Sequence, residues 1–446
     1  MRTSSTERPS ATEAAWPRWL PAALVGACVY VGFQPFTDTG GGEEGNVVNQ
    51  IGFGLLGIAA GRMVALLPLE QRRALLRPAW LLVLAALLFS VWQADWWPSA
   101  FRAGAFSLIV VLCAGATMAW PRSRDEMTGT LLAIAGTTLV FCAIAVFLYP
   151  AIGVHGSGGH EWQHVGLWRG TYPHKNVASY VFAAFVVMGL FVMRQGRVGP
   201  GLLLAATALV FTLNAGSKTV LGVLPAALAV GWIAARLRSP VLRAGLVVLP
   251  LVLLCVATLG AAFVEPVDDA LQAVAPNTTY TGRMDLWRFT AEQIGKDVHT
   301  GYGFESFWTT PRVTGLEQPI ELSWDVRKIV HGHNSYLDAV VTFGLWGALA
   351  VFAVVVVRPI YHFARLPRPA DGAAGAFAQM CITLWLLCAL GGCLESFFLR
   401  RSDPVWFTMA LALFGLQIAY ERTRYLRAAG VKSSGVSRST TVSAPA

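Results

Sequence analysis

Residues 128–149 read TGTLLAIAGTTLVFCAIAVFLY, an apolar run of 22 residues without a charged side chain. A run of about 17–25 apolar residues is long enough to cross the hydrocarbon core of a bilayer as a helix. Because lipid cannot satisfy backbone hydrogen bonds, such a run has to be helical. Similar runs recur along the 446-residue chain, which is 55% hydrophobic and only 13% charged. The sequence therefore predicts an all-α polytopic integral membrane protein.

We expect about twelve membrane-spanning helices, most of them joined by short polar connections, and one large loop late in the chain. The expected spans cover residues 19–36, 48–68, 79–93, 104–120, 128–149, 176–193, 200–214, 219–235, 244–263, 337–357, 374–394 and 404–420.

Basic residues cluster in alternate connections, and this sets the expected orientation because Lys and Arg are retained on the cytoplasmic side. Thirteen of the 34 Lys and Arg residues lie in five alternate connections, three in the N-terminal tail and five in the C-terminal tail. Both termini are then cytoplasmic, and the large loop faces the periplasm or the cell exterior. The net charge of +9 reflects the cytoplasmic loops and does not indicate nucleic-acid binding.

The expected organisation has five parts. These are a cytoplasmic tail at 1–18, nine helices in 19–263, a large periplasmic loop at 264–336, three helices in 337–420, and a basic, disordered cytoplasmic tail at 421–446.

Neither the cysteines nor the loop histidines indicate a metal site. All seven cysteines lie inside apolar runs, where free Cys packs as a small hydrophobic residue. His155, His160 and His164 share a Gly-rich loop, but their loose spacing and the lack of Cys or carboxylate partners favour an ordinary loop. We expect neither a metal ion nor a cofactor.

The outer face carries an unusual set of cations, although Lys and Arg are usually retained on the cytoplasmic side. They lie in the stretch Trp168-Arg169-Gly170-Thr171-Tyr172-Pro173-His174-Lys175-Asn176, at Lys218, at Arg283 and His333, and at Arg400 and Arg401. The sixth and tenth spans both present their N-termini here, and we expect Asp338 to form a capping box with Ser335 at the tenth. Helix N-termini and converging cations together suit a lipid-linked diphosphate at the membrane surface.

Arg283 is a better ligand candidate than Arg288 on the helix predicted to start near Gly282. Arg288 lies three residues after Asp285 and four before Glu292, so surface ion pairs account for it. Arg283 has no acid at either helical offset.

A histidine beside a diphosphate can act as a general base, because its ordinary pKa is about 6.5. We choose His333, and the sequence leaves His331 open. No Gly-rich phosphate loop, Asp-x-Asp motif or cytosolic domain indicates an enzyme that uses ATP or nucleotide sugars.

The ordered motifs resemble the bacterial O-antigen ligase and polysaccharide polymerase superfamily. They are Arg169–His174-Lys175-Asn176, Gly282-Arg283 with Trp287, Gly301-Tyr302-Gly303-Phe304, and His331-x-His333-Asn334-Ser335-Tyr336-Leu337. The resemblance implies a metal-independent glycosyltransferase that takes glycan from undecaprenyl diphosphate at the periplasmic face. It places Arg169 and Arg283 on the diphosphate with help from Lys175, and His333 on the acceptor hydroxyl. Supporting residues are His174, Asn176, Lys218, His331, Asn334 and Arg400.

The motifs also bear on which branch of the family the chain resembles, the polymerases or the ligases. Ser217-Lys218-Thr219 and Trp168-Arg169-Gly170 look more like exopolysaccharide polymerases than like ligases that transfer to lipid A-core. A transporter or flippase of lipid-linked glycan would need polar residues deep in several spans. The expected spans of this chain lack such residues, apart from Glu395 and the motif residues near the outer ends. The implied partners are an undecaprenyl-diphosphate-linked oligosaccharide, an acceptor glycan or lipid A-core, and membrane lipid. A chain-length regulator is left open.

Overall fold

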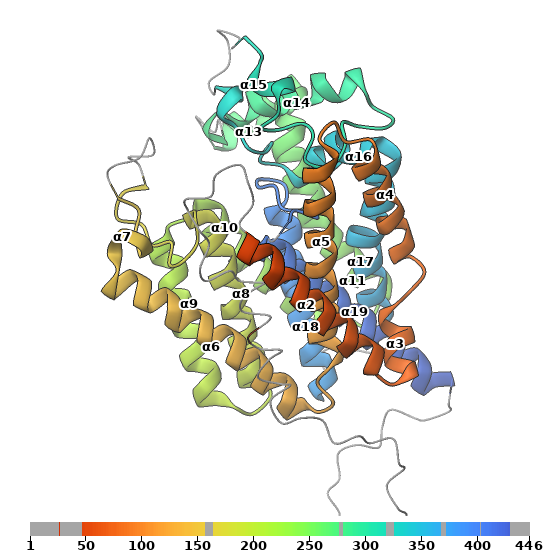
Figure 1. Ribbon diagram of the computed structural model, residues 1–446. Helices are drawn as coiled ribbons and strands as arrows, with labels where there is room; N and C mark the ends of the chain where they lie inside the picture. Colours follow the sequence, from red (N-terminus) through yellow and green to blue (C-terminus); the bar gives the residue numbers. More distant parts are fainter. Residues whose placement is uncertain are drawn as a thin grey trace, which may run out of the picture.

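The computed structural model describes residues 26, 47–156, 164–275, 280–317, 325–366, 372–401 and 403–428 (Figure 1). The tail at 1–18, the first expected span at 19–36 apart from Gly26, His160, and residues 429–446 of the C-terminal tail lie outside this part of the chain.

The described residues form a helical bundle without a named strand, so the predicted all-α class is confirmed. The one extended pairing is an antiparallel bridge between Val154 and Trp168. The helices are α2 (Val47–Leu66), α3 (Leu69–Leu75), α4 (Trp80–Trp92), α5 (Trp97–Ala119), α6 (Arg124–Leu148), α7 (Pro150–Gly153), α8 (Lys175–Arg194), α9 (Val198–Ala215), α10 (Lys218–Arg236), α11 (Pro240–Cys255), α12 (Ala261–Phe263), α13 (Glu265–Val274), α14 (Arg283–Lys296), α15 (Pro311–Thr314), α16 (Ser335–Phe352), α17 (Arg358–Arg365), α18 (Gly372–Gly391) and α19 (Pro404–Ala428).

The protein is a multi-pass membrane protein. In the described residues, eight helices are long and apolar enough to cross a membrane, or nine if the bent pair α3 and α4 is one span. Every expected span from 48–68 onward coincides with a described helix, and α19 continues past the expected end at residue 420 to Ala428. The total of about twelve stays a prediction.

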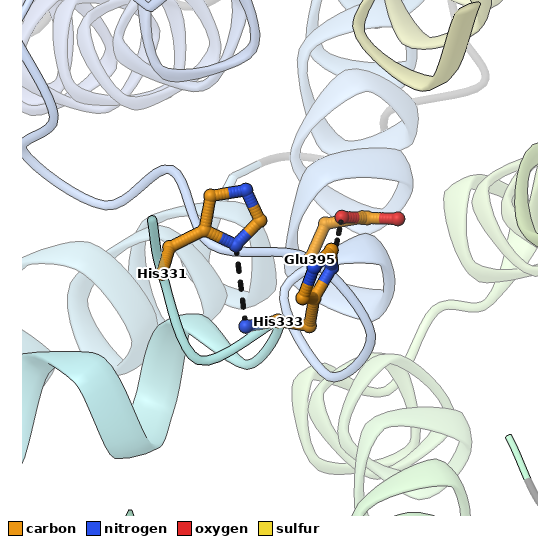
Figure 2. A group of neighbouring side chains, drawn as sticks. All are labelled: His331, His333 and Glu395. Carbon is orange, nitrogen blue, oxygen red and sulfur yellow. Dashed lines mark hydrogen bonds and ion pairs between the residues drawn. The ribbon is translucent and has the colours of Figure 1, made fainter. Parts of the chain in front are cut away.

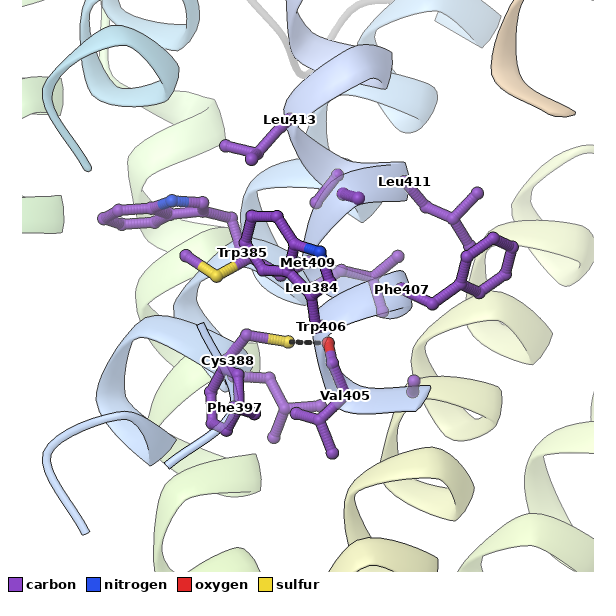
Figure 3. Close-up of a cluster of buried hydrophobic side chains, with 14 of the residues drawn as sticks. Leu384, Trp385, Cys388, Phe397, Val405, Trp406, Phe407, Met409, Leu411 and Leu413 are labelled. Atoms are coloured by element: carbon purple, nitrogen blue, oxygen red, sulfur yellow. Dashed lines mark hydrogen bonds between the residues drawn. The ribbon is translucent and has the colours of Figure 1, made fainter. Parts of the chain in front are cut away.

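The centre of the bundle is the packing of α18 against α19 (Figure 3). Trp385 and Trp406, one on each helix, have no exposed surface. A helix that is apolar on all sides is stable only when other helices surround it or lipid does. Here the Trp385 indole donates to the Val355 carbonyl at 2.8 Å, inside the π-helical turn Ala353–Val357 that joins α16 to α17.

Connections that alternate along the sequence meet at opposite ends of the bundle. At one end, capped by α13 to α15 at the top of Figure 1, Arg312 pairs with Asp95 at 2.6 Å. At the other end, Arg77 pairs with Glu421 at 3.3 Å, and Arg243 donates to the Leu366 carbonyl at 2.8 Å. This segregation agrees with the alternating connections on which the predicted orientation depends.

The motif Gly301-Tyr302-Gly303-Phe304 binds the large loop to α16 at a break in that helix. Gly344 interrupts the helix with φ 65° and ψ 178°, which frees neighbouring carbonyls. The amides of Tyr302 and Gly303 donate to the carbonyls of Val341 (2.8 Å) and Thr342 (3.2 Å). Gly301 itself has φ 68°, and a Cβ there would lie 2.7 Å from the Val341 oxygen. Two backbones approach so closely that only glycine fits.

Candidate active site at the loop end of the bundle

Glu395 is the residue on which the candidate site converges. It follows α18 and is 8% exposed. Its Oε1 accepts hydrogen bonds from Arg283 Nη2 at 2.8 Å and from Asn176 Nδ2 at 2.9 Å. Its Oε2 lies 3.0 Å from His333 Nδ1 (Figure 2). We call these four residues the Glu395 cluster; they join α8, α14, the segment before α16 and the segment after α18.

The charges of the cluster determine where the His333 proton lies. Burial raises the pKa of Glu395, but the Arg283 guanidinium and His333 outweigh burial and bring this pKa below its usual value. Glu395 is therefore an anion at neutral pH and can only accept hydrogen bonds. It follows that His333 carries its proton on Nδ1, which leaves the lone pair on Nε2, as in a base oriented by a carboxylate.

His331 has the opposite arrangement. Its Nδ1 accepts a hydrogen bond from the His333 backbone amide at 3.3 Å, so its proton is on Nε2 (Figure 2). The two rings contact edge to face at 4.2 Å between centroids. Burial and the Arg400 charge hold the pKa of His331 well below 6.5, so the ring is neutral. At Nε2, therefore, His331 is a hydrogen-bond donor and His333 a hydrogen-bond acceptor.

His333 is held in an uncommon backbone conformation, with φ 52°. Directly after it, Asn334 caps α16, because its Oδ1 accepts from the amides of Tyr336 (3.0 Å) and Leu337 (3.1 Å). The Asn334 side-chain amide in turn donates to the Cys393 carbonyl at 2.9 Å. The cap therefore fixes both the helix start and the turn that carries Glu395.

The expected capping box between Ser335 and Asp338 is wrong. Ser335 Oγ donates to the Glu395 carbonyl at 2.8 Å and accepts from the Phe397 amide at 3.0 Å. Asp338 instead accepts from the Gly332 amide at 2.9 Å. The capping box failed because the preceding Asn334 satisfies the first amides of the helix.

The expectation that Arg283 lacks an acid partner is also wrong. Glu395 is that partner, and Arg283 Nη1 also donates to the Leu394 carbonyl at 2.7 Å. Arg288 pairs with Asp285 at 3.5 Å, as the helical spacing predicted. Spacing on one helix reports only local acids, and Glu395 lies 112 residues further along the chain.

Arg169 binds backbone carbonyls and does not contact the Glu395 cluster directly. Its guanidinium donates to Ile152 at 2.8 Å, Pro173 at 3.3 Å and Ala151 at 3.4 Å. It thereby ties α7 to the segment that leads into α8. No ion pair of Arg169 is found among the described residues.

His174, Lys175 and Lys218 form a neighbouring group. His174 caps α8 by accepting from the Asn176 amide at 3.1 Å. Lys175 Nζ donates to the Gly216 carbonyl at 3.3 Å, and the exposed Lys218 begins α10 two residues later. Because Asn176 reaches Glu395 from the first turn of α8, this group is joined to the Glu395 cluster through that turn.

The loop histidines also gather at the start of α8. The rings of His155, His164 and His174 lie 5.2–5.7 Å apart, edge to face, and His155 Nε2 accepts from the Lys175 amide at 3.2 Å. In the described chain, the group whose ligand atoms lie close enough to share a metal ion is His331, His333 and Glu395. There both Nδ1 atoms already make hydrogen bonds and Arg283 occupies the carboxylate, so the geometry favours proton transfer, and the expected lack of a metal stays a prediction.

Glu395 was not among the predicted site residues. The sequence held one signal for it, since it is an acid at the outer end of an otherwise clean span. Arg400 lines a pocket beside His331, and its Nη1 lies 3.5 Å from the Ser396 carbonyl.

The comparison with known families matches only the central stretch of the chain. Residues 200–352, from α9 to α16, match the family model described as O-Antigen ligase. The matched stretch is similar to that family and covers less than half of the chain. It includes Arg283 and His333, whereas Asn176 and Glu395 lie outside the matched residues. The resemblance predicted from the motifs is thereby confirmed.

The chain is also similar to one named protein. The chain is 28% identical over 286 residues to the exopolysaccharide production protein ExoQ of Rhizobium meliloti (strain 1021). The match covers 60% of this chain and 60% of that relative, so it spans less than two thirds of the relative's length.

Proposed function

We propose that the protein is an inner-membrane glycosyltransferase that joins glycan repeat units carried on undecaprenyl diphosphate, at the periplasmic face and without a metal ion. The observation that carries this proposal is the 3.0 Å contact between His333 Nδ1 and the Glu395 carboxylate, which Arg283 holds from its other oxygen. A histidine oriented in this way, beside helix N-termini and cations, suits base catalysis next to a diphosphate.

The proposed reaction transfers a glycan to an acceptor hydroxyl. The hydroxyl gives its proton to His333 Nε2 as its oxygen bonds to the anomeric carbon of the donor. The bond from that carbon to the diphosphate breaks, and undecaprenyl diphosphate leaves with the electron pair. Each charge-assisted contact to this leaving group would contribute about 1.5–3 kcal/mol.

The cations divide into two kinds for this role. Arg283 is largely neutralised by Glu395, so its contribution is to fix the carboxylate and to offer its Nε, which is buried and lacks an acceptor in the described residues. Arg169 and Lys218 contact no carboxylate in the described ion pairs, and their charge is available to a diphosphate. We therefore assign the diphosphate to the start of α8 and α10.

We favour a polymerase over a ligase. The relative ExoQ is named as an exopolysaccharide production protein, and the motif Ser217-Lys218-Thr219 favours the same branch. The alternative is transfer of finished glycan to lipid A-core, which the same arrangement of residues would serve.

The size distribution of lipid-linked and surface glycan in a strain lacking this gene distinguishes these functions. Single repeat units left on the carrier indicate a polymerase. Long chains that accumulate on the carrier without reaching their acceptor indicate a ligase. Unchanged polymer in both pools would contradict both.

The role of His333 has its own test. His333→Ala should abolish transfer, by at least about 100-fold, because the base is lost. The matched control is His299→Ala, since His299 is exposed and stacks on Trp346 away from the cluster. Both variants should reach the membrane and melt like the wild-type protein. Normal transfer by His333→Ala would refute the role.

A further inference from the structure

A pocket of about 80 Å³ opens beside the Glu395 cluster. Its walls come from residues 303–308, 330–331 and 396–400 and from α16. The His331 ring lines it, and His333 packs behind that ring with 4.2 Å between centroids. A molecule in the pocket would therefore contact His331 and lie one ring away from the proposed base.

Trp308 forms a fixed aromatic wall of this pocket. Its indole Nε1 donates to Asp338 Oδ1 at 2.9 Å, and the other Asp338 oxygen accepts from the Gly332 amide at 2.9 Å. A Cβ at residue 332 would lie 2.6 Å from Asp338 and 3.2 Å from the indole, so glycine is required there. The ring nevertheless stays partly exposed. An aromatic ring that is held by its polar end and remains partly exposed is suited to stacking.

The polar groups of the pocket mix donors and acceptors. His331 offers its Nε2 proton, and Arg400 offers a guanidinium that approaches the Ser396 carbonyl only at 3.5 Å. Glu305 and Asp338 supply carboxylates to the same walls. Two carboxylates would repel a diphosphate. Paired donors and acceptors beside aromatic rings match the hydroxyl groups and the apolar face of a sugar ring.

The backbone around the pocket is held in conformations that ordinary residues seldom adopt. Glu305 (φ 53°) and Thr309 (φ 63°) flank residues 306–308, and Leu399 (φ 54°) precedes Arg400. Such conformations persist only where the surrounding structure enforces them, and they concentrate at functional sites. The surrounding structure thus fixes the walls of the pocket.

We propose that this pocket holds a sugar ring of the acceptor glycan, with its reactive hydroxyl directed to His333. The inference rests on the proposed glycosyl transfer and adds to it a place for the acceptor, separate from the diphosphate at the starts of α8 and α10. The donor's own sugar has the same chemistry, and the test has to distinguish the two.

Steady-state kinetics of the purified full chain make that distinction. The donor is the lipid-linked repeat unit, and the acceptor probe is the oligosaccharide released by mild acid from the polymer of the same bacterium. Trp308→Ala should raise KM for the acceptor about three- to tenfold, the size of a lost aromatic stacking contact, and leave KM for the donor unchanged. The matched control is Trp346→Ala, because Trp346 is 65% exposed and does not line the pocket.

Two further measurements keep the proposal falsifiable. If Trp308→Ala fails to fold, Arg400→Gln takes its place, because the hydrogen bond that this side chain makes to Ser396 is long, at 3.5 Å, and the substitution should raise the same KM. An unchanged acceptor KM would overturn the proposal, and a raised donor KM would reassign the pocket to the donor sugar. If the wild-type protein transfers nothing, the proposed function fails by itself. Saturation-transfer NMR with the oligosaccharide then tests the pocket: signal that Trp308→Ala abolishes supports it, and no signal overturns it.

Discussion

At the scale of single residues, the site is a set of mutually dependent contacts on one buried carboxylate. The Glu395 carboxylate accepts hydrogen bonds from Arg283, Asn176 and His333 at once. Removing one member of a buried ion pair costs about 3–5 kcal/mol, because the other charge is left without compensation. We therefore expect Arg283→Ala to impair folding as well as transfer, which makes it a poor probe of diphosphate binding.

Substitution of Glu395 by Gln is the more informative change. A neutral amide no longer fixes the His333 proton on Nδ1, so transfer should fall by about 10²–10⁴-fold, mainly in kcat and not in KM. The pH dependence of the remaining activity should also differ from that of the wild-type protein. Kinetics across pH 5–9 would measure both.

Glu421→Gln is the control for this experiment. It removes a carboxylate that also pairs with an arginine, Arg77 at 3.3 Å, but at the opposite end of the bundle. It should retain wild-type kinetics. Equal loss in both variants would show that the effect is structural, and wild-type activity of Glu395→Gln would contradict the role of Glu395.

His331 predicts how stability responds to acid. An unfolded histidine has a pKa of about 6.5, whereas in the folded site burial and Arg400 hold the pKa of His331 far lower. Below pH 6.5 the unfolded chain therefore binds a proton that the folded site excludes, and stability falls. Between pH 6.5 and 5.5 this loss is about 1 kcal/mol. His331→Asn should flatten this part of the stability curve, measured by thermal unfolding in detergent, whereas His299→Asn should not.

At the scale of elements, the break in α16 shows how the large loop is fixed to the membrane helices. The apolar run predicted one uninterrupted span at 337–357, and Gly344 divides it. Carbonyls freed by the break accept from Tyr302 and Gly303. Breaks of this kind are tolerated inside a membrane protein because other protein groups satisfy the backbone.

Gly301→Ala tests this docking. A Cβ would strain the left-handed backbone and collide with Val341 and Gly344, so the protein should lose at least about 2 kcal/mol of stability. Gly295→Ala is the matched control, because a Cβ there meets nothing within 4 Å and alanine should stabilise α14 by about 0.5–1 kcal/mol. Thermal unfolding of both variants gives the comparison. An unchanged midpoint for Gly301→Ala would contradict the docking.

At the scale of the whole molecule, the two ends of the bundle should face opposite compartments. The exposed residue Val274 on α13 belongs to the end with the Glu395 cluster, and the exposed residue Arg238 lies in an opposite connection. In intact cells with a permeable outer membrane, an impermeant maleimide should label Val274→Cys and should not label Arg238→Cys. The unsubstituted protein measures background from its own cysteines. Labelling of Arg238→Cys alone would reverse the orientation.

The sequence by itself was enough for the helices and for the family. An apolar run is a local property, and lipid leaves it only the helical state, which is why the expected span 176–193 and α8 differ by one residue at each end. His333 could be chosen in the same way, because its neighbours and its place before a helix are local. The exposed cation Lys218 was likewise visible as a departure from the usual charge bias.

Only the tertiary structure decided which groups act together. Glu395 meets His333 across 62 residues, Arg283 across 112 and Asn176 across 219. Spacing within a helix could not reveal these partners, and it wrongly left Arg283 without an acid. The sequence could not exclude His331 as the base, and the two histidines differ because one faces a carboxylate and the other a backbone amide. Proton position and charge pairing depend on atoms within about 3 Å, and those atoms are brought there by the packing of helices that are distant along the chain.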